Sequence, residues 1–238
     1  METEVLGMKK LMLLMLAGVF GALMAGSAMA TALDIAVIAP TSGSISYAGG
    51  LAPLVGTGID VDNITGLDTP LNSGEGGAQL LLSNAFLNFT TGALTGVWEW
   101  GGGPDTTITI VGGVPALQIP DGTTLLTGDF GLAQIAYRNG TFGIAGGSFF
   151  DIKDPRILDY YGLPSFLPGT EEPYPYAGNF QISFSAPFTS VGAAFTSTLV
   201  LSGDIANTPA PVPEPATMVL LGSGLVGLAG FRKKFRKS

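Results

Sequence analysis

The chain has 238 residues, a formal net charge of −8, and neither cysteine nor histidine. The absence of these two residue types excludes disulfide bonds, zinc sites made of Cys and His, and the Ser-His-Asp and Cys-His nucleophile systems. The 36 glycines and 16 prolines, together with a hydrophobic fraction of 46%, are typical of short apolar strands separated by turns, and they favour an all-β fold.

The N-terminus has the three parts of a secretory signal. Lys9 and Lys10 precede a long apolar run, and Ala28 and Ala30 then supply the small residues that signal peptidase recognises. We therefore expect residues 1–30 to be a signal peptide, which directs the chain to the Sec translocon and is removed by signal peptidase.

Residues 31–206 are expected to form one β-rich domain outside the cytoplasm. Short apolar runs are separated there by Gly, Asn, Asp and Pro, and no fixed repeat period is present. An antiparallel β-sandwich or jelly-roll-like domain is therefore favoured over a propeller or a solenoid. The expected strands are 33–39, 78–90, 97–100, 106–111, 123–130, 134–138, 141–149, 179–185 and 194–201.

Two patterns predict how some of these strands pair and face. The dipeptide Asn139-Gly140 favours a two-residue type I′ turn, which predicts an antiparallel hairpin between the strands on either side of it. Phe180, Ile182 and Phe184 alternate with polar residues, so we expect their side chains to share one face and to pack in the core.

The domain is strongly acidic. Residues 31–211 contain 15 acidic and 3 basic residues, and such a surface repels phosphate backbones, so no nucleic-acid partner is expected. Several of the acids and prolines lie in 151–175, which is predicted to be a long loop with a helical turn at 157–161.

Trp98 and Trp100 are the candidate residues for sugar binding. At alternate positions of a strand both rings would lie on one face, where they could stack on the sugars of an extracellular polysaccharide. The alternative, which the sequence favours, is that both rings belong to the core. Four tyrosines in or beside the long loop could add to a stacking surface: Tyr160, Tyr161, Tyr174 and Tyr176.

Glu99, between the two tryptophans, is the candidate acid for glycoside hydrolysis, which uses a pair of carboxylates across a cleft. In a strand it would point away from both rings, so the simpler interpretation is a solvent-facing residue. No catalytic residue is assigned, and we do not expect the chain to be an enzyme.

Asp60 and Asp62 are the candidate metal ligands. Carboxylate oxygens suit Ca²⁺, but the short Asp-Val-Asp-Asn sequence lacks the remainder of an EF-hand loop. A solvated turn is the alternative, and Ca²⁺ is the one cofactor that the sequence suggests.

The C-terminus also has three parts. A Pro-rich linker over 207–215 is followed by an uncharged run over 216–231, which is predicted to be a transmembrane helix of about 24 Å. The tail, 232–238, is basic, and it should remain in the cytoplasm and hold the domain outside the inner membrane. The linker ends in Pro213, Glu214 and Pro215, and the basic residues are Arg232, Lys233, Lys234, Arg236 and Lys237.

The order Pro-Glu-Pro, Gly/Leu-rich run and basic cluster over 212–237 resembles the PEP-CTERM sorting tail of Gram-negative bacterial proteins. The resemblance implies that an exosortase, an integral-membrane processing enzyme, recognises Pro213, Glu214 and Pro215, in a bacterium that makes extracellular polysaccharide. We therefore expect an exported structural or matrix protein, anchored in the inner membrane or released to the surface and associated with biofilm. The alternatives are a carbohydrate-binding module and an enzyme that acts on polysaccharide with carboxylates alone.

Overall fold

The computed structural model describes residues 31–39, 41–74, 79–138, 141–146, 149–187, 190 and 192–211. The chain divides into two compact units, Met1–Ala30 and Thr31–Ser238. The predicted signal peptide, Pro-Glu-Pro motif, transmembrane helix and basic tail lie outside the described residues. Within the described part of the chain, no helix is both long and apolar enough to cross a membrane.

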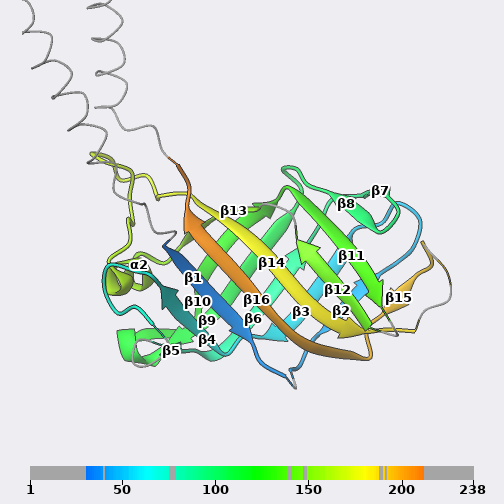
Figure 1. The fold of residues 1–238 in the computed structure, drawn as a ribbon, viewed down its shortest axis with the longest axis horizontal. Helices are drawn as coiled ribbons and strands as arrows, with labels where there is room; N and C mark the ends of the chain where they lie inside the picture. Colours follow the sequence, from blue (N-terminus) through cyan, green and yellow to red (C-terminus); the bar gives the residue numbers. More distant parts are fainter. Residues whose placement is uncertain are drawn as a thin grey trace, which may run out of the picture. The chain divides into compact units, whose positions relative to one another are not determined.

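The described part of the second unit is mostly β-structure with one short α-helix (Figure 1). The helix α2 spans Pro155–Tyr161, and a 3₁₀ turn, η1, spans Pro115–Leu117. The strands are β1 (Ala32–Val37), β2 (Ser44–Tyr47), β3 (Leu54–Asp60), β4 (Asn63–Leu67), β5 (Leu80–Leu81), β6 (Ser83–Thr90), β7 (Leu94–Gly96), β8 (Glu99–Gly101), β9 (Thr107–Val114), β10 (Ile119–Phe130), β11 (Leu132–Arg138), β12 (Thr141–Gly146), β13 (Phe149–Lys153), β14 (Tyr176–Ser185), β15 (Phe195–Thr196) and β16 (Leu199–Pro209).

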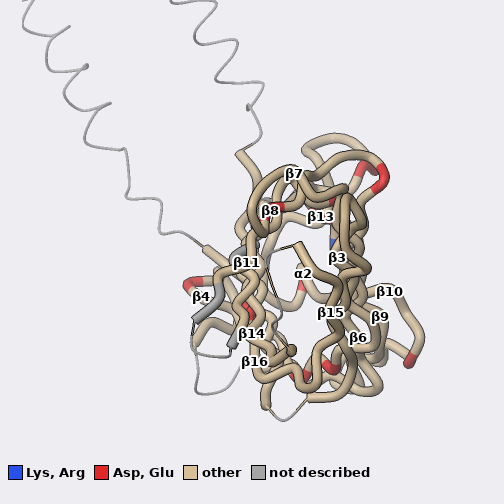
Figure 2. Tube along the Cα trace, turned by 90° about the vertical axis from the view of Figure 1, so that its right-hand side faces the viewer, with Lys and Arg blue, Asp and Glu red and all other residues tan. Residues whose placement is uncertain are grey.

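All of these strands belong to one antiparallel sheet, which curls on itself as a half-barrel. In one series of hydrogen-bonded neighbours the strand order is β15-β2-β3-β6-β9-β10-β13-β14-β12-β11-β8-β7. A second series branches from β14 and has the order β14-β16-β1-β4-β5. Viewed along the curl, the two halves of the sheet face each other (Figure 2). The all-β, antiparallel prediction is confirmed, but the halves are joined by hydrogen bonds through β13 and β14 rather than forming two separate stacked sheets.

Strand β14 is the junction of the sheet. One of its edges pairs first with β13, at Tyr176–Gly178, and then with β12, at Gln181–Ser185, while its other edge pairs with β16 along its whole length. Because three strands share β14, its inward-facing side chains meet residues from both halves. Phe180, Ile182 and Phe184 are all completely buried, as predicted.

Aromatic side chains fill the space inside the curl. The ring of Phe180 meets the ring of Phe89 on β6 edge-on, with centroids 5.1 Å apart, and it meets Phe130 on β10 at 5.7 Å. Farther along, Tyr47 on β2 meets Trp100 on β8 edge-on at 5.2 Å. Edge-on aromatic pairs add to the stabilisation that comes from burying their area. Packing of these rings therefore adds to the hydrogen bonds between β13 and β14 in holding the two halves of the sheet together.

The predicted hairpin is confirmed, and other predicted strands need correction. Strands β11 and β12 pair antiparallel with Arg138 opposite Thr141. By contrast, β2, β3 and β4 were not predicted: β3 and β4 contain glycines, which are typical of turns, and β2 is only four residues long. Gly56 lies within β3 where the ring of Phe89 occupies the position of a side chain, so the packing of that ring requires glycine there.

The predicted loop over 151–175 is shorter than expected. Its first three residues belong to β13, and α2 then forms where the helical turn was predicted. The side chain of Asp154 caps the helix by accepting a hydrogen bond from the backbone N–H of Arg156 at 2.9 Å. Gly162 ends the helix in the left-handed conformation, and Tyr161 anchors it by donating a hydrogen bond to the carbonyl of Ile64 at 2.7 Å.

Candidate functional site

The C-terminal end of the domain is built around β16, which lies between β1 and β14. The pairing with β14 continues to Pro209 opposite Tyr176. One residue later, the backbone N–H of Ala210 donates to the carbonyl of Pro175 at 3.0 Å, and the hydroxyl of Tyr174 donates to the carbonyl of Ala210 at 3.1 Å. We call Tyr174, Pro175 and Ala210 the tail clamp.

The tail clamp corrects the predicted boundary of the linker. Asn207 is completely buried within β16, and Ala210 is only 7% exposed, so the first residues assigned to a Pro-rich spacer belong to the folded domain. Pro209 fits at the end of β16 because a terminal strand residue can dispense with its N–H. Two residues, 211 and 212, separate the clamp from Pro213. The span from Ala210 to Pro213 is therefore at most about 10 Å.

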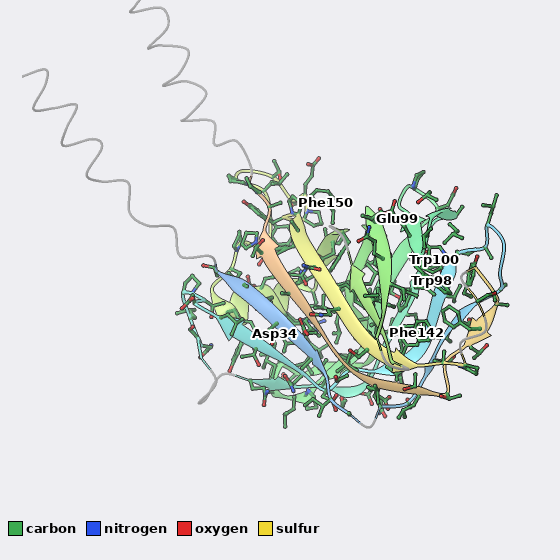
Figure 3. The ribbon with its side chains drawn as sticks, turned by 45° about the vertical axis from the view of Figure 1, so that its right-hand side comes forward. Asp34, Trp98, Glu99, Trp100, Phe142 and Phe150 are labelled. Carbon is green, nitrogen blue, oxygen red and sulfur yellow. The ribbon has the colours of Figure 1, made fainter. Side chains whose placement is uncertain are left out.

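The two tryptophans are not a surface for sugars. Trp98 is 8% exposed and Trp100 is fully buried, and their rings lie 6.0 Å apart in the cluster that Figure 3 shows beside Phe142. Trp98 is not in a strand but in the turn between β7 and β8, with a positive φ of 55°. Trp100 donates from Nε1 to the carbonyl of Ala52 at 3.1 Å. Buried rings cannot stack on a sugar, so the core alternative is correct.

Two of the four tyrosines proposed to extend the stacking surface are also buried. The hydroxyl of Tyr161 donates to Ile64, and that of Tyr176 donates to the carbonyl of Pro164 at 2.9 Å. Burial raises the pKa of both phenols above its usual range, so both remain protonated donors. Tyr160 and Tyr174 are half-buried, and the hydroxyl of Tyr174 is engaged in the tail clamp.

Glu99 lies at the start of β8, half-buried and on the side opposite Trp100. The amide Nε2 of Gln134 donates to Glu99 Oε2 at 2.6 Å, across the β8–β11 pair. This hydrogen bond links two neighbouring strands. Glu99 therefore has a structural role between β8 and β11. None of its described contacts is with a second carboxylate, which glycoside hydrolysis would need.

Asp60 and Asp62 hold backbone groups of neighbouring segments. Asp62 Oδ2 accepts a hydrogen bond from the N–H of Ile38 at 2.7 Å, and Asp60 Oδ2 accepts one from the N–H of Ser42 at 3.3 Å. The two carboxylates therefore serve different segments. Across the described ranges, no group of three or more His, Cys, Asp or Glu side chains could hold a metal ion.

A pair of carboxylates on the outer side of the sheet was not predicted. Asp34 on β1 is half-buried, and Asp204 on β16 lies diagonally across the strand pair, because Asp34 is opposite Ala206 and Asp204 is opposite Ala36 (Figure 3 labels Asp34). Burial, followed by the charge of Asp204, raises the pKa of Asp34 above its usual range. The strand register brings these acids together, and sequence reasoning without the register could not.

A buried polar cluster on β13 and β16 was also missed. Lys153 Nζ lies 2.6 Å from Asp151 Oδ2, with side-chain exposures of 2% and 0%, and the Nδ2 of Asn207 donates to Asp151 Oδ1 at 2.9 Å. The ammonium group also lies 4.2 Å from the centre of the Tyr176 ring. Burial raises the pKa of Asp151 and lowers the pKa of Lys153 to about 8, although each charge partly offsets the other's shift.

The segment that follows the tail clamp is similar to a known sorting motif. Residues 211–234 match the PEP-CTERM protein-sorting motif. The C-terminal tail is a PEP-CTERM sorting signal. A tail with this motif implies an extracellular protein that exosortase sorts, with export and membrane-anchored processing. No curated protein and no solved structure matches the chain.

The PEP-CTERM match starts directly after the tail clamp. Its first residue, Pro211, follows Ala210, which within the described residues is the last one that the domain holds by a backbone hydrogen bond. The folded domain and the sorting signal are thus contiguous. Pro213, the first residue of the Pro-Glu-Pro sequence, is at most about 10 Å from Ala210 of the tail clamp.

Proposed function

We infer that this chain is a non-enzymatic structural protein of the cell surface or extracellular matrix, delivered by its PEP-CTERM tail and associated with extracellular polysaccharide. The observation that carries the inference is the sorting motif at 211–234, placed directly after a folded, acidic β-domain. Export through the Sec translocon, removal of residues 1–30 by signal peptidase and insertion of residues 216–231 in the inner membrane would precede recognition by exosortase.

The properties of the domain support a structural role. Its largest aromatic side chains are used for packing across the curl, and its described acidic residues other than Asp151 are at least partly exposed and occur in several separate segments (Figure 2). An acidic surface favours solubility and hydration among neutral or cation-bridged polysaccharide chains. The carbohydrate-binding alternative loses its main support, because Trp98 and Trp100 belong to the core.

Mass spectrometry of both termini in each cell fraction tests the sorting part of this inference. The native chain should begin at Thr31, lose its tail near Pro213–Pro215, and appear in the outer-surface or extracellular fraction. Replacing Pro213, Glu214 and Pro215 together by alanine should leave the tail uncut and the protein in the inner membrane. The control is Pro209→Ala, which changes a nearby proline outside the motif. Native protein recovered from the cytosol with residues 1–30 still attached would refute the proposal.

The proposed association with extracellular polysaccharide needs a separate measurement. The processed protein should sediment with the extracellular polysaccharide of its host and be released when that polysaccharide is enzymatically degraded. If the correctly sorted protein stays free in the medium at every stage of growth, the association with polysaccharide is wrong while the sorting proposal still stands.

A further inference from the structure

Strand β13 has an unusual distribution of polar and apolar side chains. Phe150 and Ile152 face outward, 60% and 38% exposed, while Asp151 and Lys153 face the interior. Burying a charged pair is costly, and apolar residues of similar size would usually be no less stable there. The strand therefore places an amine and a carboxyl group inside the domain where packing alone does not require them.

Asn207 completes this cluster from two strands away. It lies on β16 opposite Gly178 of β14, which in turn lies opposite Phe149 of β13. A side chain at position 178 would collide with the Asn207 amide and the Phe149 ring, so glycine leaves the space through which Asn207 reaches β13. Three strands are thus arranged so that the carboxamide of Asn207 meets Asp151.

The carboxyl group of Asp151 lies between the amine and the carboxamide. Its Oδ2 accepts from Lys153 Nζ at 2.6 Å, and its Oδ1 accepts from Asn207 Nδ2 at 2.9 Å. The Oδ1 of Asn207 is buried and, within the described residues, has no hydrogen-bond partner. A buried carbonyl without a partner is unusual in a folded protein. All three side chains of this triad, Asp151, Lys153 and Asn207, are at least nine-tenths buried.

We propose that the triad forms an intramolecular amide cross-link between the side chains of Lys153 and Asn207. Uncharged Lys153 Nζ attacks the Cγ atom of Asn207. Asp151 removes a proton from the attacking nitrogen through Oδ2 and gives a proton to Nδ2 through Oδ1. The Cγ–Nδ2 bond breaks, one molecule of ammonia leaves, and a new Nζ–Cγ amide joins β13 to β16. The reaction needs no oxidant and no cofactor.

The surroundings of the triad favour this chemistry. A nucleophilic amine must be uncharged, and burial lowers the pKa of Lys153 to about 8, so a useful fraction is uncharged near neutral pH. Burial also raises the pKa of Asp151, which makes it a better proton carrier. One carboxyl group holds both the amine and the carboxamide, so the two reacting groups are already positioned and need not meet by diffusion. An exported chain without cysteine would gain a covalent cross-link that does not depend on disulfides.

The test is peptide mapping of the full-length protein, purified from cells that export it and digested after denaturation. The expected result is a pair of peptides joined through Lys153 and Asn207, lighter than their sum by one ammonia, with no tryptic cleavage after Lys153. A succinimide at Asn139 would also remove one ammonia from the whole chain, so only the joined peptides count as support. Cleavage after Lys153 in the bulk of the native protein, with Asn207 recovered in an unlinked peptide, overturns the proposal.

Two variants separate the chemistry from the packing. Asp151→Asn removes the proton carrier with little change in shape, and Lys153 should then be cleaved by trypsin. Asp154→Asn is the matched control, because Asp154 forms the neighbouring ion pair with Arg156 and asparagine is an equally good helix cap. It should leave the cross-link complete. If the Asp151 variant fails to fold, the native peptide map still decides the question. A cross-link of native extent in a folded Asp151 variant would refute the role of the carboxyl group.

Discussion

The hydroxyl of Tyr174 should control how often the end of β16 opens. Tyr174→Phe removes only the hydrogen bond to Ala210, whose oxygen lies 3.1 Å from the hydroxyl, and keeps the ring. Such a bond contributes about 1 kcal/mol, or a factor of about 5 in a local opening equilibrium. The bond from Ala210 N–H to Pro175 remains, so the strand should stay paired.

Hydrogen exchange of the Ala210 amide in the purified full-length chain measures this opening directly. Exchange should be about 5-fold faster in Tyr174→Phe than in the native protein. Tyr160→Phe is the control, because it removes a hydroxyl from another half-buried tyrosine that is not part of the tail clamp. Identical Ala210 exchange rates in the native and Tyr174 chains would refute the idea that this side chain holds the domain's C-terminal end.

Three other substitutions test the packing and the electrostatics. Phe180→Ala should lower the free energy of unfolding by about 3–5 kcal/mol in urea titrations, whereas Gln181→Ala, on the exposed side of the same strand, should change it by less than about 0.5 kcal/mol. Gly56→Ala should reduce stability despite the smallness of the added methyl group, because an aromatic ring occupies that position; unchanged stability would contradict the packing. Asp34→Asn should stabilise the domain at neutral pH, since the raised pKa means that ionised Asp34, near Asp204, disfavours the folded state. That gain should disappear as the pH falls through the raised pKa of Asp34, and an equal gain at acidic pH would show a different cause.

Sequence patterns predicted the features that depend on a short stretch of chain: which side chains of a strand are buried, and where a tight turn joins two neighbouring strands. Alternation at Phe180, Ile182 and Phe184 gave the correct buried face, and Asn139-Gly140 gave the correct hairpin. Glycine-rich strands were missed because a glycine that makes room for a neighbouring ring has the same appearance in the sequence as a glycine in a turn.

The buried triad shows a different limit. Asp151 and Lys153 are charged, so any pattern based on polarity places them in a solvated loop, and Asn207 lies in the predicted linker. Their contacts depend on the register of three strands and on the missing side chain at Gly178. Among the candidate functional sites, the sorting motif could be recognised without a structure, because its residues follow one another along the chain.

The course of β16 has a mechanical consequence for a protein tethered by its C-terminus. Any pull on the tether is transmitted along this strand, which pairs with β14 from Leu199 to Pro209 and with β1 from Gly203 to Asn207. Tension in that direction loads many backbone hydrogen bonds together in shear, instead of opening them one at a time as it would in a strand peeled from an edge. A domain anchored through this tail should therefore resist unfolding by a pull on its C-terminus better than a domain whose last strand lies at a sheet edge.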